Sequence, residues 1–384
     1  MADSSHSQSW IEMFANSNID ARVFANIVFD GGRYNPIKWN GESYVLFQPQ
    51  VDRGVKVNYL IPNWKYTRFV GQQLDYRLSL NKKFLSRVIN KWKPDIVHSL
   101  SLLPSGLFAW QAMKNIEVKQ RPLFVCSSYG SDIYVSKDKI DERKQLEEIL
   151  LNCDGFISDC ERDLGNAVSI GLEQKKIAFD YGIPVTGGIN VDSNHNNNGE
   201  KRNVILIPKA YEGFANKTLP ILEALNLIKE SLANFEIHLL MSDFDVEWYL
   251  SKMPQELKDI CYLHKQIPKE QVLDLMLRSR AVVAPSISDG TPTSLLEAMW
   301  AGALPVVSPL ESIKEWIVDK KNGLLVNAIS PNEIADGIRR AISDDELFSS
   351  AQNINREVIS KRANREIIRA EVINYYQTVM NERN

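Results

Sequence analysis

Short runs of apolar and β-branched residues alternate along this chain with longer segments whose apolar residues recur at helical spacing. In the first half, the short runs predict strands at 21–29, 55–62, 95–101, 123–129, 155–160 and 176–184. Helices are predicted between them, near 72–92, 104–115, 140–152 and 161–171. Such alternation is typical of βαβ units, in which helices cover both faces of a parallel sheet.

The alternation starts again after a polar interruption at 193–202 (SNHNNNGEKR), which has no periodicity and is typical of a linker. Beyond it the sequence predicts strands at 203–208, 235–242, 281–286, 303–308 and 323–326, and helices at 217–230 and 360–382. The predicted fold class is therefore α/β, with two Rossmann-like domains at 1–195 and 201–364. Whether the C-terminal helix, 365–384, packs back on the first domain is left open.

Ligands of open α/β sheets bind beyond the carboxyl ends of the strands, so the sequence predicts two domains that face a cleft holding the working site. The length of 384 residues agrees with two domains of roughly 180 residues each. Apolar residues make up 44% and charged residues 24%, which is a globular composition. The formal net charge of −3 gives no electrostatic reason to expect a nucleic-acid partner.

Cysteine and histidine usage predicts neither a disulfide framework nor a metal site. No CxxC pair occurs, and the five histidines never approach a metal-ligand spacing. We therefore expect no metal, and reduced structural thiols at Cys126, Cys153, Cys160 and Cys261. The first ten residues are polar and no stretch of 18 apolar residues occurs, so we expect no signal peptide, no membrane span and a cytoplasmic protein.

The segment 281–308, AVVAPSISDGTPTSLLEAMWAGALPVVS, combines a buried strand, a polar loop and a helix. Pro292 is suited to a first helical turn, which predicts a helix at 292–301 with Thr291 as its N-cap. Gly290, in the loop, would let a ligand approach the backbone closely. The segment therefore predicts a ligand at the start of this helix.

That ligand is expected to be an anion. The amides of Thr293, Ser294 and Leu295 have no acceptor inside the helix, and the positive end of the helix dipole points the same way. Asp289 lies on the loop, and Glu297 lies about a turn and a half into the helix. Two acids so placed can bind different parts of one polar ligand whose phosphates dock on the amides between them.

A purely structural alternative is a capping box, in which Ser294 and Glu297 cap the helix and Asp289 is solvated. Pro292 argues against it, because a helix that starts at Ser294 leaves the proline without a role. We therefore favour the ligand site.

The same segment resembles the nucleotide-sugar signature of retaining glycosyltransferases with the GT-B fold, in particular glycosyltransferase family four. In that signature seven residues separate a first acid from the Glu of the helix. Here Asp289 opens the pattern, and the LEAM of 296–299 closes it, with Gly302 and the PVV of 305–307 behind. Because the match lies in the predicted strand–loop–helix context, it is specific.

The resemblance implies that Glu297 binds the donor ribose, and that Asp289 holds sugar hydroxyls or stabilises the reacting centre. Further donor contacts are implied for Gly290, Thr291, Pro292, Thr293 and Ser294. The family usually has Glu where this chain has Asp289. The side chain of Asp289 is one methylene shorter than that of Glu and cannot reach the same atom without a backbone shift, so this difference affects which donor sugar is bound.

The family also supplies cations for the donor diphosphate from the loop after the first strand of the second domain. That loop is 209–217 (KAYEGFANK) in this chain. Lys209 matches the family's usual Arg and Lys217 its usual Lys, which implies a catalytic role for both beside Asp289. The alternative is two solvated lysines. We favour the functional interpretation because both flank the carboxyl end of the predicted strand.

Acceptor contacts are implied for the first domain. The candidates are His6, His98, Gly130 and Asp132. His98 lies in KPDIVHSLS, which resembles the family's strand ending in His, and a satisfied core histidine is an equally weighted alternative. Gly130 and Asp132 lie in SSYGSDIY, which resembles a glycine loop of the family, with Tyr129 in place of its usual His.

His6 lies in a segment that resembles the family's N-terminal loop. In the family this loop follows a central strand, whereas only three residues precede Ser4 here. We therefore expect the first strand to be nearly absent, or the sheet to be completed in another way.

Residues 72–93 contain six cations and a single acid, Asp75, with apolar residues at helical spacing. An amphipathic basic helix can lie on the anionic inner face of a membrane. The alternative, which we favour, is a Rossmann helix whose apolar side packs on the sheet.

From the resemblance we expect transfer of a sugar from a nucleoside-diphosphate sugar to a hydroxyl of a glycan, glycolipid or other cell-surface polysaccharide precursor. The favoured donor is a UDP-sugar. Retention of configuration and independence of metal and cofactor are implied. The expected partners are the nucleotide sugar and a glycan or lipid-linked acceptor. Two alternatives stay open, namely a protein of the same fold with other chemistry, such as an epimerase, and a non-catalytic scaffold.

Overall fold

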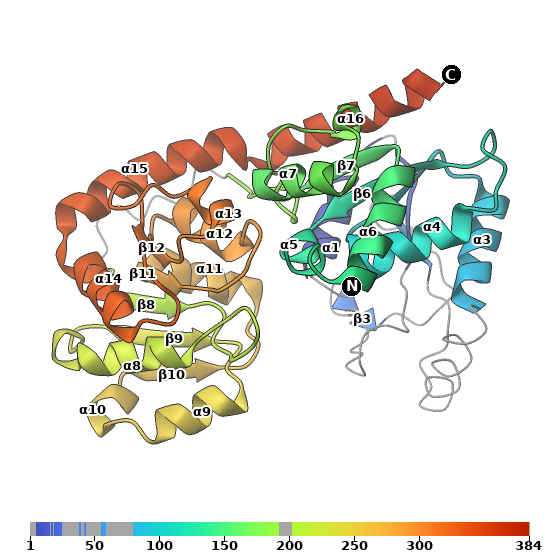
Figure 1. The fold of residues 1–384 in the computed structure, drawn as a ribbon. Helices are drawn as coiled ribbons and strands as arrows, with labels where there is room; N and C mark the ends of the chain where they lie inside the picture. The colour runs from blue at the N-terminus through green and yellow to red at the C-terminus, as the bar shows by residue number, and fades with distance from the viewer. Residues whose placement is uncertain are drawn as a thin grey trace. The chain divides into compact units, whose positions relative to one another are not determined.

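The computed structural model describes residues 5–15, 17, 19–24, 38–39, 42–43, 55–58, 80–191 and 202–383. The chain divides into two compact units. The first comprises Met1–Gly188 and Glu366–Asn384, and the second comprises Ile189–Arg365. The last helix, α16 (Arg365–Arg383), therefore belongs almost entirely to the first unit (Figure 1).

The second unit is built on a six-stranded sheet in which every pair of neighbouring strands is parallel. The strand order is β10 (Cys261–His264), β9 (Glu236–Leu240), β8 (Val204–Ile207), β11 (Ser279–Ala284), β12 (Leu304–Val307) and β13 (Leu324–Leu325). This is the 3-2-1-4-5-6 order of a Rossmann fold. The chain changes direction across the sheet between β8 and β11, which places the topological switch point there.

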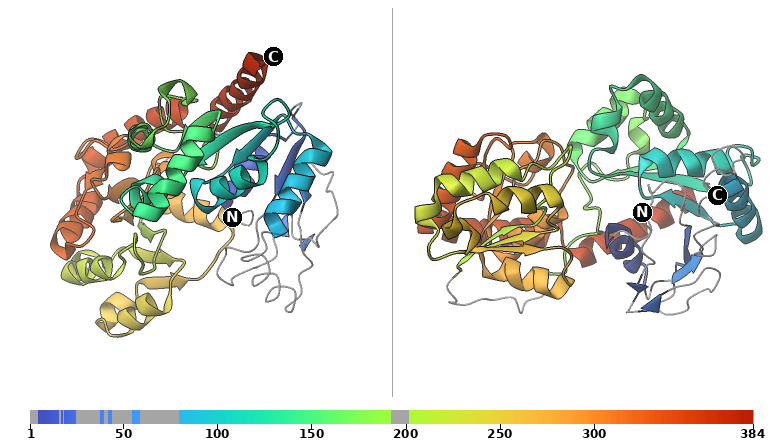
Figure 2. Two further views of the ribbon diagram at one scale, coloured as in Figure 1. Left: turned by 45° about the vertical axis from the view of Figure 1, so that its right-hand side comes forward. Right: turned by 90° about the horizontal axis from the view of Figure 1, so that it is seen from below.

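Helices cover both faces of this sheet (Figure 2). The helices of the unit are α8 (Leu219–Leu227), α9 (Phe244–Ser251), α10 (Gln255–Lys258), α11 (Lys269–Arg278), α12 (Thr293–Ala301), α13 (Glu311–Lys314), α14 (Pro331–Ser343) and α15 (Asp345–Arg362), with a 3-10 turn at Lys229–Ser231. Ile205 and Ile207 pack on one face with α8, α9 and α14. Val204 and Leu206 pack on the other face with α11 and α12, as the two-residue period of a strand requires.

The first unit contains a parallel sheet of β5 (Ile96–Ser99), β6 (Leu123–Ser128) and β7 (Gly155–Ser158). It also contains a parallel pair, β1 (Ala21–Phe24) and β4 (Val55–Asn58), and an antiparallel pair, β2 (Lys38–Trp39) and β3 (Glu42–Ser43). Its other elements are α1 (Ser5–Glu12), α3 (Leu80–Trp92), a π-helical turn η1 (Leu102–Gly106), α4 (Leu107–Met113), α5 (Asp132–Ser136), α6 (Ile140–Asn152), α7 (Glu161–Ile170) and a 3-10 turn η2 (Gln174–Lys176).

The β5–β7 sheet is also covered on both faces. Phe124 and Cys126 of β6 pack with α3, α4, α6 and α7. Val125, between them, points to the other face and packs with Trp10 of α1 and Val372 of α16. The fold is thus α/β with parallel sheets and two Rossmann-like units, as the sequence predicted.

One predicted strand is absent, and one strand of the six-stranded sheet was not predicted. The segment 176–184 is not a strand: it starts in η2 and makes only an isolated bridge between Ile177 and Phe156. Its apolar side chains, such as Phe179 and Tyr181, pack on the core from a coil. The sequence also missed β10, a four-residue edge strand whose Tyr262 and Leu263 are exposed, so that it has no continuous apolar pattern.

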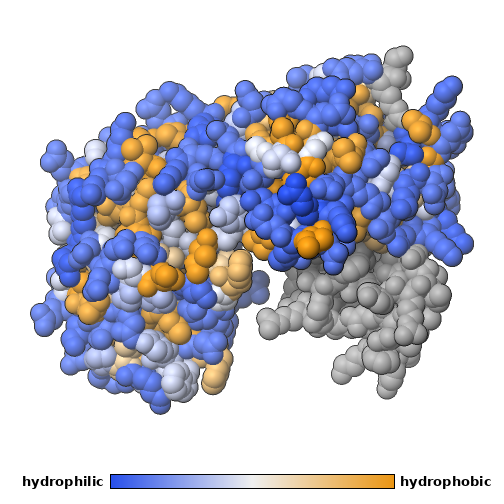
Figure 3. Space-filling view, viewed as in Figure 1, coloured by the Kyte–Doolittle hydropathy of each residue, from blue (hydrophilic) through white to orange (hydrophobic). Residues whose placement is uncertain are grey.

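Several predictions fall partly outside the described residues. These are the strand ends at 25–29 and 59–62, the helix start at 72–79 and the linker up to residue 201. The described part begins with α1, so a strand before it would also lie outside. Within the described part, no helix is long and apolar enough to cross a bilayer. On the face that Figure 3 shows, hydrophobic residues reach the surface in small groups among hydrophilic ones.

Candidate functional site

Two loops of the second unit lie together at the switch point. The loop 208–218 follows β8, and the loop 285–292 follows β11, its parallel neighbour. The Ile287 amide donates to the Ala215 carbonyl at 2.8 Å, and Asn216 forms a bridge with Ser286. Because the carboxyl ends of parallel strands meet at one edge of a sheet, the polar residues of both loops share that edge.

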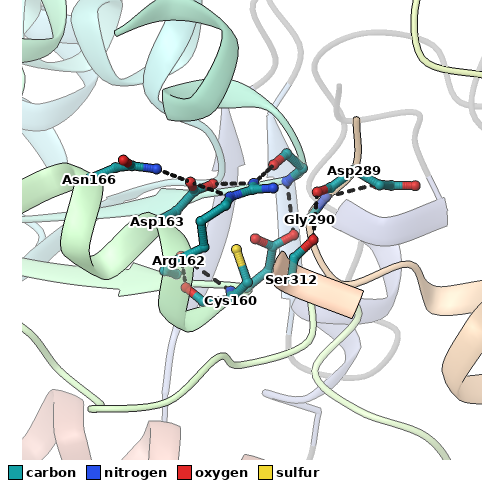
Figure 4. Close-up of polar contacts among 10 residues, drawn as sticks. Cys160, Arg162, Asp163, Asn166, Asp289, Gly290 and Ser312 are labelled. Carbon is teal, nitrogen blue, oxygen red and sulfur yellow. Dashed lines mark hydrogen bonds and ion pairs between the residues drawn. The ribbon is translucent and has the colours of Figure 1, made fainter. Parts of the chain in front are cut away.

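Lys209 and Asp289 form an ion pair across these loops. The Lys209 Nζ lies 2.8 Å from Asp289 Oδ2, and the side chains are 31% and 20% exposed. Burial by itself lowers the pKa of Lys209, but Asp289 more than offsets this, so the pKa is raised and the lysine stays charged. Asp289 Oδ1 accepts from the Gly290 amide at 3.0 Å, and the Asp289 carbonyl accepts from Ser312 Oγ at 2.9 Å (Figure 4).

Lys217 lies at the other end of the loop after β8. Its Nζ donates to the Gly213 carbonyl at 2.7 Å and lies 3.8 Å from Glu212 Oε2. Glu212 Oε1 in turn accepts from the Leu219 amide at 2.7 Å, at the start of α8. This acid, which the sequence reasoning missed, ties the loop to the helix and holds Lys217 near the switch point.

The start of α12 differs from the prediction by one residue. The helix begins at Thr293, and Pro292, with a φ of −69°, is its N-cap. Thr291 is therefore not the N-cap, and its hydroxyl instead accepts from the buried Trp316 indole at 3.1 Å. The Leu295 amide is not available to a ligand either, because it donates to the Pro292 carbonyl at 3.0 Å.

The capping-box alternative is wrong, because Pro292 and not Ser294 caps the helix. The hydroxyl oxygens of Thr293 and Ser294 are buried and have no hydrogen-bond partner in the described part of the chain. Buried polar groups are nearly always bonded in a native protein. Two unbonded hydroxyls at a helix start therefore suggest a polar ligand.

Glu297 follows these hydroxyls on the same helix. Burial raises the pKa of its carboxyl group, and Lys269 opposes this shift only in part. A carboxyl group that is costly to ionise in the free protein gains from hydrogen-bond donors that a ligand brings. The role implied for Glu297, the binding of ribose hydroxyls, fits this environment.

In the first unit, both ring nitrogens of His98 are engaged. Nδ1 lies 2.6 Å from the Tyr376 hydroxyl of α16, and Nε2 lies 2.7 Å from Ser127 Oγ. The Trp10 ring packs edge-on against the imidazole. Desolvation lowers the pKa of His98 to about 3, so the ring is neutral. This environment matches the core-histidine alternative, and an acceptor contact would have to displace one of these bonds.

Gly130 and Asp132 lie at the carboxyl end of β6. Asp132 Oδ2 accepts from the Leu102 amide at 3.0 Å, and burial raises the pKa of its carboxyl to about 7. Gly130 has a φ of +62° and donates its amide to Asp159 Oδ2 at 2.8 Å. Open space lies where a Gly130 side chain would be. A hydroxyl-bearing acceptor could approach the backbone there.

Asp159 and its neighbours were missed by the sequence reasoning, although they directly follow β7. Asp159, Cys160 and Asp163 offer atoms within 4.8 Å of one another that could hold a metal ion. However, Arg162 forms an ion pair with Asp163 at 3.0 Å and donates to the Gly130 carbonyl at 3.1 Å (Figure 4). The Arg162 guanidinium thus supplies the positive charge that a metal ion would otherwise bring to these acids. Through their bonds to Gly130, Arg162 and Asp159 hold the Gly130 loop in place.

Two predictions remain, His6 as an acceptor contact and the basic segment 72–93 as a membrane contact. His6 is exposed on α1. The described part of the basic segment is α3, and its Leu85 and Ile89 are buried in the core. These two apolar side chains therefore pack inside the protein, as in the Rossmann-helix alternative.

Comparison with known families gives one match. Residues 192–361 match the family model described as glycosyl transferases group 1. This range lies within the second unit and contains Lys209, Lys217, Asp289 and Glu297. A search of curated protein sequences found no match.

Solved structures show the same fold along most of the chain. A glycosyltransferase from Rickettsia africae ESF-5 matches with a TM-score of 0.61 and 16% identity, over 84% of this chain and 85% of that one. Sucrose-phosphate synthase from Thermosynechococcus elongatus matches with a TM-score of 0.66 and 16% identity, over 87% and 85%. HepE from Anabaena, in complex with UDP-glucose, matches with a TM-score of 0.62 and 13% identity, over 85% and 86%. The fold is therefore that of GT-B glycosyltransferases, with two Rossmann-like units.

Proposed function

We propose that this protein transfers a glycosyl group from a nucleoside-diphosphate sugar to a hydroxyl group of a glycan, glycolipid or other polysaccharide precursor. One observation carries the proposal: Lys209, Lys217, Asp289 and the start of α12 converge at the switch point between β8 and β11. Cations and free helix amides at such a point are suited to a diphosphate. The group 1 glycosyltransferase match over 192–361 supports the same assignment.

The donor diphosphate is bound by the amides of Thr293 and Ser294 together with Lys209 and Lys217. The buried hydroxyls of the same two helix residues complete their hydrogen bonds with donor oxygens. Glu297 accepts from the ribose hydroxyls. Binding also loosens the Lys209–Asp289 pair, because the phosphate competes for the ammonium group and leaves the Asp289 carboxylate to the sugar hydroxyls.

In the reaction the bond between the anomeric carbon and the phosphate oxygen breaks, and the acceptor oxygen forms a bond to the same carbon on the same face. The acceptor proton passes to the leaving phosphate oxygen. Negative charge develops on that phosphate, where Lys209, Lys217 and the α12 amides are already oriented. Such preorganised charge is commonly the largest single contribution to catalysis. We propose that it suffices without a metal ion.

The proposed donor is a UDP-sugar. A protein of the same fold, HepE from Anabaena, has been solved in complex with UDP-glucose, which supports this choice. For the acceptor we propose contacts from Gly130 and Asp132, where the backbone is open, with His6 as a weaker candidate. His98 has a secondary role there, because its ring is bonded on both sides.

The test is incubation of the purified protein with radiolabelled UDP-glucose, UDP-N-acetylglucosamine and UDP-galactose and an acceptor extract. We expect label in a glycan or lipid fraction from one of these donors, and label that appears about tenfold to a thousandfold more slowly with a Glu297→Ala variant. A donor converted into its epimer without transfer would favour the epimerase alternative. Saturable donor binding without any turnover would favour a non-catalytic protein.

A further inference from the structure

The helix α3 of the first unit, which packs beside α4, presents a row of cations to solvent (Figure 1). Lys83, Arg87 and Lys91 are spaced four residues apart and therefore share one side of the helix. All three are exposed, whereas Leu85 and Ile89 are buried on the opposite side. Because a helix rises about 1.5 Å per residue, the row is about 12 Å long.

No acid of the described residues balances this row. The sequence of α3 contains no acid, and in the described part of the chain no ion pair or hydrogen bond engages the side chains of Lys83, Arg87 and Lys91. On α6 of the same unit an exposed cation is paired instead, since Arg143 Nε lies 3.1 Å from Glu147 Oε1. The uncompensated charge is thus a property of α3.

Helix stability does not explain these cations. Lys82 and Lys83 lie in the first turn, near the positive end of the helix dipole, where acids and not cations are stabilising. The chain as a whole has a net charge of −3, so the row does not reflect a general excess of positive charge either. Positive charge gathered on one face of a negatively charged protein can direct that face toward an anionic partner.

An anionic lipid surface fits this face. Each Lys or Arg held near such a surface strengthens binding by about fivefold. A nucleic acid fits less well, because the exposed residues described on this face, which include Asn90, offer no aromatic ring to stack on a base. Since Leu85 and Ile89 pack in the core, the contact is electrostatic and does not insert the helix into the bilayer.

We propose that the outer face of α3, formed by Lys83, Arg87 and Lys91, binds the anionic headgroups of a membrane surface. Lys93, exposed directly after the helix, adds a further cation. The contact holds the protein at the surface where a glycolipid acceptor resides, and this last point alone rests on the proposed function. Salt weakens the contact, because it screens charges that attract each other through water.

The test is co-sedimentation of the full-length protein with lipid vesicles, without donor or acceptor. We expect binding to phosphatidylcholine vesicles with about 30% phosphatidylglycerol to exceed binding to pure phosphatidylcholine by about tenfold or more, and to fall when NaCl is raised from about 0.1 M to about 0.5 M. The double variant Arg87→Gln/Lys91→Gln should bind the anionic vesicles about tenfold or more weakly, since it loses two cations of the row. The matched control is Lys144→Gln/Lys175→Gln, which removes two exposed lysines of the same unit.

A variant that keeps the charge, Lys83→Arg/Lys91→Arg, should bind as the wild type does, which separates loss of charge from loss of folding. Equal binding to the two kinds of vesicle, or an equal loss in the control variant, would overturn the proposal. A single-stranded oligonucleotide that binds α3 more tightly than the vesicles do would assign the face to nucleic acid and overturn it as well. Because no sugar transfer is measured, failure of this contact leaves the proposed function standing, and a missing transferase activity leaves this contact standing.

Discussion

Asp289 has both carboxylate oxygens engaged, one by Lys209 and one by the Gly290 amide. These two bonds fix the position of the carboxylate at the switch point. Glycosyltransferase family four, which this segment resembles, usually has a glutamate here. Its carboxylate would lie one methylene farther out and could not bond both Lys209 and the Gly290 amide from the same backbone position. In the proposed reaction, the shorter acid therefore limits which sugar hydroxyls Asp289 can reach.

We expect Asp289→Glu to change the donor preference. The ratio of kcat/KM values for two UDP-sugars that differ at one hydroxyl should shift by about tenfold or more, because a misplaced buried partner discriminates strongly. The measurement is a competition assay with both donors, and Asp336→Glu, on the exposed side of α14, is the control. An unchanged ratio would mean that Asp289 does not face the sugar.

Glu297 and Lys217 carry different parts of the proposed donor site. We expect Glu297→Ala and Lys217→Ala each to lower turnover by about tenfold to a thousandfold, as does the loss of one charge-stabilising donor in an enzyme site. Steady-state kinetics with the preferred UDP-sugar measures this. The controls are Glu230→Ala and Lys229→Ala, exposed residues of the same unit. Near-normal activity of both site variants would break the assignment.

The raised pKa of Glu297 has a consequence for stability. An unfolded glutamate loses its proton near its ordinary pKa of 4.5, before the buried one does. The unfolded state then binds fewer protons, so stability falls as the pH rises from 4.5 through the folded pKa. Glu297→Gln removes this effect. The free energy of unfolding of Glu297→Gln minus that of the wild type should increase as the pH rises and become constant above the folded pKa.

Urea unfolding of both proteins at several pH values between about 4 and 8 measures this difference. A difference between Glu297→Gln and wild type that does not depend on pH would show that the carboxyl group is not desolvated in the folded protein.

Among the elements, the loop before α12 has its own internal support. The Trp316 indole, buried beside α13, donates to the Thr291 hydroxyl. We expect Thr291→Val to lower the free energy of unfolding by about 1–3 kcal/mol, because it leaves a buried N–H without a partner. Thr291→Ser keeps the hydroxyl and should lose less than half as much. Equal losses in the two variants would point to packing of the Thr291 methyl group instead.

The elements also show what a sequence can predict. The strand–loop–helix at 281–301 was predicted within one or two residues, because a buried strand, Pro292 and an apolar helix face all give local signals. The ion pair of Lys209 with Asp289 was not predictable from spacing alone: it depends on β8 and β11 being neighbours. The same holds for Arg162 and Asp159, whose partners lie about thirty residues away along the chain.

Local signals failed where packing decides the conformation. The segment 176–184 has the composition of a strand, but it contains Pro184 and packs on the core as a coil. His98 has the residue type of a functional histidine, and only its contacts with Tyr376 and Ser127 show that it is bonded on both sides. Tyr376 is 278 residues farther along the chain, beyond any local pattern.

In the molecule as a whole, the residues proposed to bind the donor and those proposed to bind the acceptor belong to different units. The second unit has the Rossmann strand order and the match to the group 1 glycosyltransferase model. The first unit supplies Gly130 and Asp132 and includes α16, which bonds to His98. The proposed division of donor and acceptor binding between two units is compatible with the two-unit fold found along most of the chain.

The central claim is that the switch point between β8 and β11 binds the diphosphate of a sugar nucleotide. The most direct measurement is a crystal structure of the protein soaked with UDP-glucose. It should show the diphosphate on the amides of Thr293 and Ser294, the ribose on Glu297 and an ammonium group of Lys209 or Lys217 on a phosphate oxygen. A sugar nucleotide bound elsewhere, with this pocket vacant, would contradict the account.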